Sequence, residues 1–209
     1  MQNIRIGQIT SVKPWQTAQA KPWQRWLARI FELVKVVIIL TMLGYLVHVF
    51  VITLFIVDGA SMEPNFFDRE YMLVDKISYN FSAPARGDVV IFSYPGEPDK
   101  KFIKRIIGLP DDTIAIKNDQ VYLYNKYYSG VLAEGYIPSE MPTPTETEVA
   151  SITQKVGKDE YFVLGDNRLN SSDSRIWGLL PKENIIGKAL VTIWPFDSAA
   201  LVEPAKYNF

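Results

Sequence analysis

The sequence predicts a mainly β fold, an antiparallel barrel or sandwich, preceded by one N-terminal transmembrane helix. Three observations predict it. Residues 36–57 carry no formal charge apart from any on His48. After Asp58 the chain consists of short segments rich in Val, Ile, Phe and Tyr, separated by turn residues. No amphipathic helical pattern follows Asp58. We therefore expect an N-terminal segment at 1–35, a helix at 36–57 and a β-rich body at 58–209.

The uncharged run is long enough to cross a bilayer, because as a helix it spans roughly 33 Å at 1.5 Å per residue. A buried core helix is the first alternative, but apolar residues on every face over this length favour the membrane. A cleavable signal peptide is the second. The run exceeds the usual apolar region of about 7 to 15 residues, and residues 57–60 lack the small-x-small pattern of a cleavage site.

Charges flanking the run predict its direction, because basic flanks stay in the cytoplasm. Bases before the run include Lys13, Lys21, Arg25, Arg29 and Lys35, with Glu32 as the one acid, and the acids that follow it are Asp58, Glu63, Asp68 and Glu70, with Arg69 nearby. The N-terminus is therefore expected in the cytoplasm, and the β-rich body on the opposite face of the cell membrane. Trp15, Trp23 and Trp26 suit the cytoplasmic interface. We expect His48 to be a structural polar residue within the span.

The β-rich body is predicted from segments bounded by turn signals such as those at 83–88 and 108–112. The expected strands are residues 71–77, 88–94, 102–107, 113–117, 120–124, 160–164 and 188–194. The stretch 135–150 is rich in Pro, Thr and Glu and is expected to form an exposed loop or a flexible insertion.

Composition excludes several classes of function. The 209 residues, 48% of them hydrophobic, suffice for one compact domain and a membrane segment. Lys and Arg number 22 against 23 Asp and Glu, so no charge excess points to nucleic acid. The absence of cysteine excludes disulfides, thiolate metal sites and a Cys nucleophile. His48 is the single histidine and lies in the apolar run, which disfavours a Ser-His-Asp triad or a histidine zinc site. No metal or cofactor is expected.

The first segment that could carry chemistry is Val57-Asp-Gly-Ala-Ser-Met-Glu-Pro64, at the end of the apolar run. Ser61 would lie close to the membrane surface. A serine between Gly and Pro is by itself most often a turn residue or a helix cap.

The second segment is Lys101-Phe-Ile-Lys-Arg-Ile-Ile-Gly108. Strand alternation puts Lys104 on one face with two apolar neighbours, and burial there would lower its pKa from about 10.4 towards the range of a general base. The alternative is that Lys104 lies on the solvated face and its neighbours point inward. The alternation alone does not decide between the two.

The third segment, residues 165–175, reads Gly-Asp-Asn-Arg-Leu-Asn-Ser-Ser-Asp-Ser-Arg and follows an apolar strand. Such a polar stretch is either a solvated loop or a hydrogen-bonded scaffold in which carboxylates pair with arginines.

The order of these segments, with Arg-Gly-Asp-Val-Val-Ile-Phe at 86–92 between the first two, resembles bacterial type I signal peptidase from Asp58 to about Pro195. The third segment matches G-D-N-R-x-N-S-x-D-S-R at every fixed position. The resemblance implies a membrane-anchored serine protease that removes signal peptides from exported precursors, with Ser61 of S-M-x-P as nucleophile and Lys104 as general base. It implies supporting roles for Ser171, which would hold the Lys104 amine, and for the pairs Asp166 with Arg105 and Asp173 with Arg175. The implied partners are precursor proteins, the lipid bilayer and the export machinery.

The sequence departs from the family pattern at three places. Asn65-Phe66 stands where Thr-Leu is common, and Asp111 stands where the G-x-P-G-D turn has Gly, so this turn is expected to differ locally. Gly59 stands where some members carry a serine that helps to bind the oxyanion. The oxyanion hole is then expected to rest mainly on the Ser61 backbone N–H, with Gly59 a weaker candidate.

Three alternatives remain at this level: a catalytically inactive relative that binds signal peptides, a structural membrane protein, and another Ser-Lys protease with different substrates. The structural protein would leave the coincidence of three segments unexplained. The apolar run counts against a soluble self-cleaving regulator.

Overall fold

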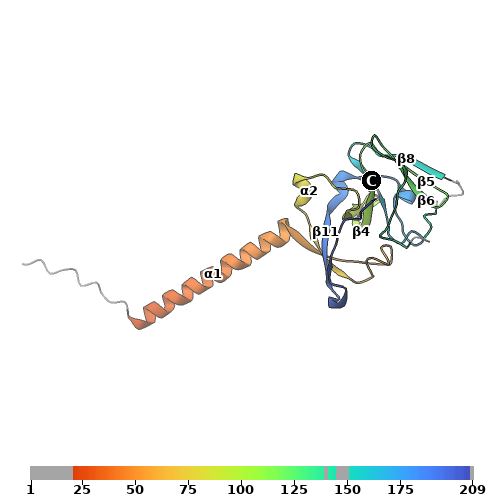
Figure 1. Ribbon diagram of the computed structural model, residues 1–209. Coiled ribbons are helices and arrows are strands. Elements are labelled where there is room, and N and C mark those ends of the chain that lie inside the picture. The colour runs from red at the N-terminus through yellow and green to blue at the C-terminus, as the bar shows by residue number, and fades with distance from the viewer. Residues whose placement is uncertain (1–20, 139–140, 145–150, 208–209) are drawn as a thin grey trace, which may run out of the picture. The chain divides into compact units, whose positions relative to one another are not determined.

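A computed structural model describes residues 21–138, 141–144 and 151–207 (Figure 1). The chain divides into two compact units, Met1–Tyr45 and Leu46–Phe209. Trp15 and the other residues before 21 lie outside the described residues, as does the side chain of His48.

Helix α1 runs from Pro22 to Phe50. Proline at the first helical position costs no hydrogen bond, because that N–H has no partner within a helix. Within the described residues, the stretch Arg25–Val47 is long and apolar enough to cross a membrane, and none of it is buried. The helix expected at 36–57 is thus wrong at both ends, and residues 52–56 form a strand. The β-branched and aromatic side chains of this strand suit a sheet. A short apolar segment of this kind cannot be distinguished from a continuation of the helix by hydropathy alone.

Eight strands of the described residues form the larger sheet. They are Ile52–Ile56 (β1), Tyr71–Asp75 (β2), Val89–Tyr94 (β3), Glu97–Gly108 (β4), Glu160–Leu164 (β9), Leu180–Pro181 (β10), Ile185–Trp194 (β11) and Ala200–Leu201 (β12). Their order is β1-β2-β11-β3-β4-β9-β10, with β12 paired to β11, and all pairs are antiparallel.

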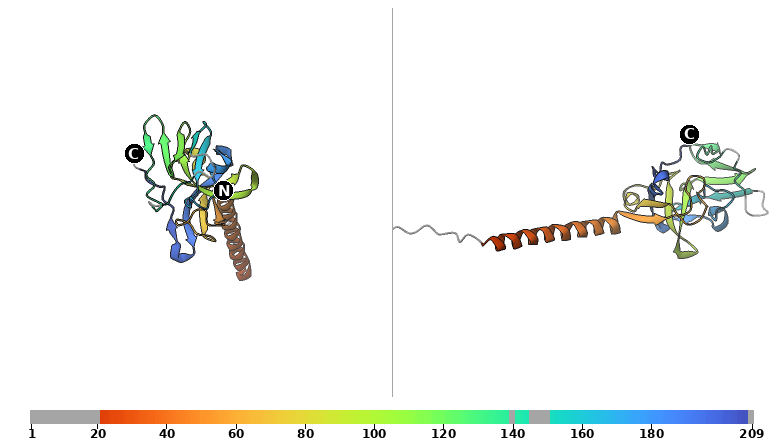
Figure 2. Two further views of the ribbon diagram at one scale, coloured as in Figure 1. Left: turned by 90° about the vertical axis from the view of Figure 1, so that its right-hand side faces the viewer. Right: turned by 90° about the horizontal axis from the view of Figure 1, so that it is seen from below.

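A second, four-stranded antiparallel sheet consists of Thr113–Lys117 (β5), Gln120–Tyr124 (β6), Ser129–Val131 (β7) and Ser151–Lys155 (β8), in the order β7-β6-β5-β8. Its strands lie to one side of β4 and β11 in Figure 1, and further views are in Figure 2. Four-residue helices at Ser78–Phe81 (α2) and Ser174–Trp177 (α3) and 3-10 turns at Lys182–Asn184 (η1) and Phe196–Ser198 (η2) complete the body. The predicted mainly β, antiparallel fold is confirmed.

All seven expected strands are present, and β5, β6 and β9 have the expected bounds. Five strands were missed: β1, β7, β8, β10 and β12. Four of these have five residues or fewer with largely exposed or intermediate positions, so they lack an apolar alternation. The first half of β4 was missed for a similar reason, because its five leading residues are all exposed.

The described part of the stretch 135–150, expected to be an exposed loop or a flexible insertion, packs against the body through Thr143. Thr143 is only 2% exposed, and its hydroxyl accepts a hydrogen bond from buried Arg168 at 2.7 Å. Residues 139–140 and 145–150 lie outside the described residues. The turn at 108–112 keeps the conformation a glycine would take, since Asp111 adopts φ 71°. Aspartate tolerates this left-handed region better than most residues, so the turn accommodates Asp111 where the family pattern has Gly.

Candidate active site

Ser61 lies in a turn between β1 and β2, and the next residue fixes that turn to the core. Met62 is fully buried and packs with Val57, Met72 and Ile103. Burial of a methionine side chain contributes about 2 kcal/mol. Within the turn, the carbonyl of Met62 accepts from the N–H groups of Asn65 and Phe66 at 3.1 and 3.0 Å. The nucleophile candidate is therefore followed immediately by an apolar anchor and a closed turn.

Lys104 comes from the middle of β4 and is 3% exposed. Its Nζ lies 2.8 Å from Ser61 Oγ and donates to the carbonyl of Ile103 at 2.9 Å. The same Nζ is 5.3 Å from the centre of the Phe102 ring. Of the two orientations open from the sequence, the structure has the buried one, and it brings together two residues 43 positions apart.

Burial lowers the pKa of Lys104 to about 8 from an ordinary 10.5. The charges of Asp173 and Asp166 act in the opposite direction, and the charge of Arg175 assists the lowering. The like charge that acts on Lys104 is thus that of Arg175. A pKa of about 8 leaves a usable fraction of neutral amine near physiological pH, as a general base needs.

The third segment forms both of the ion pairs that the resemblance implies, and both are buried. Asp166 is fully buried and receives Arg105 Nε at 2.9 Å and Nη2 at 2.6 Å. Asp173 receives Arg175 Nε at 2.8 Å and Nη2 at 2.9 Å, and its other role is to accept from the N–H of Gly165 at 3.0 Å. The segment is the hydrogen-bonded scaffold, not the solvated loop.

Ser171 does not hold the Lys104 amine as the resemblance implies. Its Oγ is buried and has no hydrogen-bond partner among the described residues. The side chain instead packs against Gly165, where an added Cβ would overlap Ser171 Oγ and lie 2.5 Å from the carbonyl oxygen of Ser61. Gly165 is therefore required by the close approach of the first and third segments. No sequence pattern reports this placement of the Ser171 side chain against Gly165.

Gly59 is also not available in its expected role. Its N–H donates to Asp68 Oδ1 at 2.8 Å, so the hydrogen is already used within the turn. The N–H of Ser61 has no acceptor in the described part of the chain. Of the two expected backbone donors, only that of Ser61 is open to a developing oxyanion.

Several residues that the sequence reading did not assign to the site connect its parts. Asn167 holds the nucleophile turn from one side: its N–H donates to Ser61 O at 3.1 Å and its Nδ2 to Ala60 O at 3.0 Å. Asn65 Nδ2 donates to Asp166 Oδ2 at 2.8 Å and to Tyr136 O at 2.9 Å. Asn167 stands within the recognised third segment and could have been found there. Asn65 gave no signal beyond its departure from the family pattern.

A second group of unassigned residues surrounds fully buried Arg168. Its guanidinium donates to both carboxylate oxygens of Glu134 at 2.7 and 2.5 Å and to the hydroxyl of Tyr136 at 2.9 Å. The Tyr136 ring lies 4.3 Å from the guanidinium carbon of Arg105. Glu134 is a single acid within a loop, and no local sequence pattern around it predicts its pairing with Arg168.

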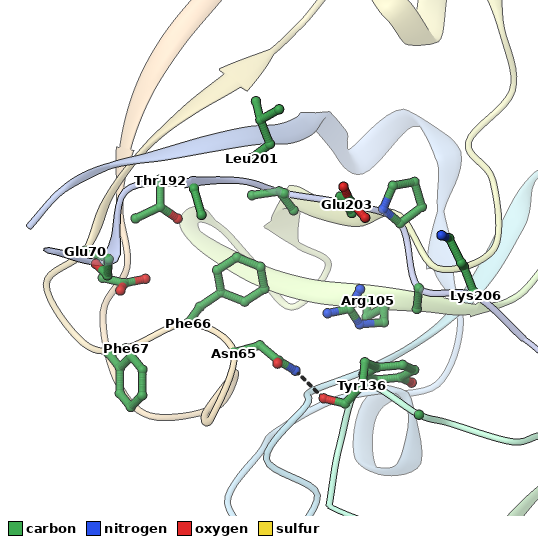
Figure 3. A pocket seen from close by; sticks show the side chains of 16 residues that line it. Asn65, Phe66, Phe67, Glu70, Arg105, Tyr136, Thr192, Leu201, Glu203 and Lys206 are labelled. Atoms are coloured by element: carbon green, nitrogen blue, oxygen red, sulfur yellow. Dashed lines mark hydrogen bonds between the residues drawn. The ribbon is translucent and has the colours of Figure 1, made fainter. Parts of the chain in front are cut away.

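Two cavities adjoin the site. A small one of about 150 Å³ borders Ser61 and Lys104 and has a partly apolar wall that includes Phe55, Phe102 and Ile103. A larger one of about 520 Å³ is bordered by Arg105, which is the strand neighbour of Lys104, and by Asn65 (Figure 3). The described residues include no cluster of three or more metal-ligating side chains. A serine hydroxyl bonded to a buried amine beside a small cavity is an arrangement suited to nucleophilic catalysis.

Comparisons with known proteins place the sequence near one family. The sequence model of the family described as signal peptidase, peptidase S26, matches residues 30–194. A probable signal peptidase I-2 of Synechocystis is 36% identical over 176 residues, covering 82% of this chain and 76% of its own. A signal peptidase I of Leptolyngbya laminosa is 34% identical and covers 84% and 85%, and one of Bacillus amyloliquefaciens is 38% identical and covers 80% and 90%. A solved signal peptidase I of Enterococcus faecalis matches at 30% identity with a TM-score of 0.42, over 51% of this chain and 97% of its own.

Proposed function

The chain belongs to the signal peptidase family, peptidase S26, and on this premise we propose that Ser61 is its nucleophile and Lys104 its general base. Signal peptidase I is a serine endopeptidase that removes signal peptides from precursor proteins, and this is the activity of the chain. The observation that carries the residue assignment is the 2.8 Å separation of Lys104 Nζ and Ser61 Oγ in a buried setting.

In the acylation step, neutral Lys104 accepts the proton of the Ser61 hydroxyl while Oγ attacks the carbonyl carbon of the scissile bond. The carbonyl electrons move to its oxygen and give a tetrahedral intermediate. On collapse the C–N bond breaks, and the Lys104 ammonium gives its proton to the leaving nitrogen. The mature protein departs, and the signal peptide remains as an ester on Ser61.

In the deacylation step, Lys104 takes a proton from water, and the hydroxide attacks the ester carbon. The bond to Oγ breaks and Ser61 recovers its proton from Lys104. One residue thus acts as base and then as acid in each half of the reaction, as a group with a pKa near the working pH can do. The pKa of about 8 supports this assignment.

The oxyanion is proposed to accept a hydrogen bond from the N–H of Ser61. This donor has no acceptor among the described residues, while the Gly59 N–H is engaged by Asp68. Loss of one such donor in a serine protease costs about 100- to 1000-fold in kcat.

The cavity of about 150 Å³ beside Ser61 is proposed to receive a small side chain of the substrate. Its apolar wall, with Phe55 and Ile103, favours a methyl group over a charge. A preference for small residues at the first and third positions before the cut follows from the resemblance to the family.

Members of this family are membrane-associated, and we propose that Arg25–Val47 is the single span of this chain. The bases at Lys21, Arg25 and Arg29 support a cytoplasmic N-terminus. The catalytic body would then lie on the opposite face, where it meets the lipid surface and precursors leaving the export machinery. Confining enzyme and substrate to one surface raises their effective concentration.

An activity assay distinguishes this function from two others. A catalytically inactive relative would bind precursors without cutting them, and another Ser-Lys protease would ignore the signal-peptide site. The test is incubation of the purified full-length protein in detergent with a precursor carrying an Ala-x-Ala site, followed by N-terminal sequencing of the product. We expect cleavage after the second Ala by the unaltered protein and none by Ser61→Ala. Equal cleavage by Ser61→Ala would reject the nucleophile, and no cleavage by the unaltered protein would favour the inactive relative.

A further inference from the structure

The side-chain amide of Asn65 links the nucleophile turn to the buried ion pair behind Lys104. One hydrogen of Nδ2 goes to Asp166 Oδ2 at 2.8 Å and the other to the carbonyl oxygen of Tyr136 at 2.9 Å. Figure 3 shows Asn65, Arg105 and Tyr136 on the border of the larger cavity, with the bond to Tyr136 drawn. Both donor hydrogens of the amide are therefore used, and they join segments far apart in the sequence.

We propose that Asn65 is a positioning residue that fixes Ser61 relative to Lys104. This inference rests on the proposed roles of these two residues. Asn65 is four positions after Ser61, and its own N–H closes the turn onto Met62 O. Its side chain then attaches this closed turn to Asp166, which is paired with Arg105, the strand neighbour of Lys104. A short path of hydrogen bonds thus runs from the nucleophile to the strand that carries the base.

The nucleophile turn is held at both of its ends by neighbouring residues of the third segment. Asn167 bonds the backbone of Ala60 and Ser61 on the leading side, and Asp166 bonds Asn65 on the trailing side. Without the trailing bond, the turn would keep its bonds to Asn167 and the buried anchor Met62, but its Asn65 end could shift relative to the strand that carries Lys104. A shift of about 1 Å between reacting groups can cost on the order of 100-fold in rate.

The exposure of Asn65 distinguishes positioning from simple stabilisation. Asn65 is exposed while Asp166 is fully buried, so the amide approaches the ion pair from the side of the cavity. If Asn65 were shortened, water from the cavity could satisfy Asp166 Oδ2 and the Tyr136 carbonyl. The hydrogen bonds would be replaced, but the connection to the nucleophile turn would not. The loss is therefore expected in turnover more than in stability.

The choice of an amide also suits the electrostatics of the base. The charge of Asp166 raises the pKa of Lys104 and so opposes the effect of burial. Asn65 reaches Asp166 without adding a charge. A carboxylate at position 65 would lack the donor hydrogens, repel Asp166 and add a second negative charge behind Lys104.

The chain offers a matched control in Asn125. Its Nδ2 donates to Asp112 Oδ1 at 2.9 Å, and Asp112 Oδ2 pairs with Arg86 at 2.8 Å. This is the same Asn-Asp-Arg chemistry, but it lies at the turn after β6 and borders neither Ser61 nor Lys104. Replacing Asn125 removes this hydrogen bond, and also the two that its Oδ1 accepts from the N–H groups of Tyr127 and Tyr128, without touching the nucleophile turn.

The experiment compares Asn65→Leu and Asn125→Leu in full-length protein in detergent, with kcat and KM measured on a precursor-derived peptide and melting followed by circular dichroism. We expect Asn65→Leu to lower kcat about ten- to 100-fold with KM changed less than about twofold. Asn125→Leu is expected to keep kcat within about twofold while its melting temperature falls at least as much. Equal kcat losses in the two variants, or an unchanged kcat in Asn65→Leu, would overturn the proposal.

Asn65→Asp gives a second readout that does not depend on how well the leucine variant folds. Its acid limb of kcat/KM should move upward by about half a pH unit or more, because a charge beside Asp166 stabilises the Lys104 ammonium. A limb at the wild-type position would contradict the proposed coupling. Ser61→Ala in the same series separates failure of the proposed function from failure of this inference. Activity in Ser61→Ala rejects Ser61 as the nucleophile. An inactive Ser61→Ala together with a fully active Asn65→Leu rejects only the positioning role of Asn65.

Discussion

The pH dependence of cleavage follows directly from the burial of Lys104. With a pKa of about 8, about a tenth of Lys104 is neutral at pH 7 and about nine tenths at pH 9. At the ordinary pKa of 10.5, the neutral fraction at pH 7 would be roughly 300-fold smaller. The acid limb of kcat/KM is therefore expected near pH 8, with a rise of about tenfold between pH 7 and 9.

The assay is kcat/KM for a fluorogenic precursor-derived peptide from pH 6 to 10, with full-length protein in detergent and Ser61→Ala as the blank. A limb near 6.5 would refute the reasoning, because it would indicate a histidine, and His48 is the single one in the chain. A value of kcat/KM still rising steeply at pH 10 would also refute it, because it would show that Lys104 is not desolvated.

The same lowering of the pKa has a consequence for stability. The folded-state pKa of Lys104 lies about 2.5 units below its ordinary value, which corresponds to about 3 kcal/mol. Because the unfolded chain binds more protons between about pH 8 and 10.5, this part of the free energy of unfolding rises with pH over that window. Lys104→Met should therefore be more stable than the wild type at pH 7, and the difference should shrink by pH 10. Denaturant unfolding at the two pH values measures this, and a constant difference would contradict it.

Three further predictions concern the scaffold. Asp166→Asn breaks a buried ion pair and should lower the free energy of unfolding by about 3 kcal/mol in denaturant. The same variant should move the acid limb of kcat/KM below about pH 8, because the Asp166 charge raises the pKa of Lys104. A limb that moved upward would contradict this prediction. Ser171→Ala removes a buried hydroxyl without a partner and should leave the melting temperature unchanged or higher, whereas a clear fall would mean that the hydroxyl is bonded. Deletion of residues 1–50 should leave a folded, active body, while deletion of 1–57 also removes β1 and should lower the melting temperature; equal melting would contradict the role of β1 in the sheet.

The strands with a regular apolar pattern could be predicted because the signal is local. Thr113–Lys117, Gln120–Tyr124 and Glu160–Leu164 are bounded by turn residues and rich in apolar side chains. Ile52–Ile56 could not be separated from the preceding helix by its sequence. It becomes a strand by pairing with Tyr71–Asp75, and the hydropathy of neither segment predicts that pairing.

The face of β4 that carries Lys104 could not be chosen from alternation for a physical reason. Residues 103–108 are all buried, so both faces of the strand are covered. The alternation argument assumes that one face of the strand is exposed to solvent. Neither face is exposed in this part of β4, so alternation cannot decide whether Lys104 is buried.

The pairs Asp166–Arg105 and Asp173–Arg175 could be foreseen from the resemblance, but the hydrogen bond of Gly59 and the Ser171 hydroxyl without a partner among the described residues could not. Gly59 is occupied by Asp68, nine residues away, because the turn folds back on itself. The side chain of Ser171 packs against Gly165. Such contacts depend on tertiary geometry that no local pattern reports.

The most direct test of the central claim is to trap the acyl-enzyme. Full-length protein is mixed with precursor, quenched in acid within the first turnovers, digested and examined by mass spectrometry. The Ser61–Lys104 pair predicts the signal peptide as an ester on Ser61, and no ester in Lys104→Ala. Ser172 is the built-in control, because it borders the same cavity. An ester on Ser172, or precursor cleavage that continues in Ser61→Ala, would contradict the account.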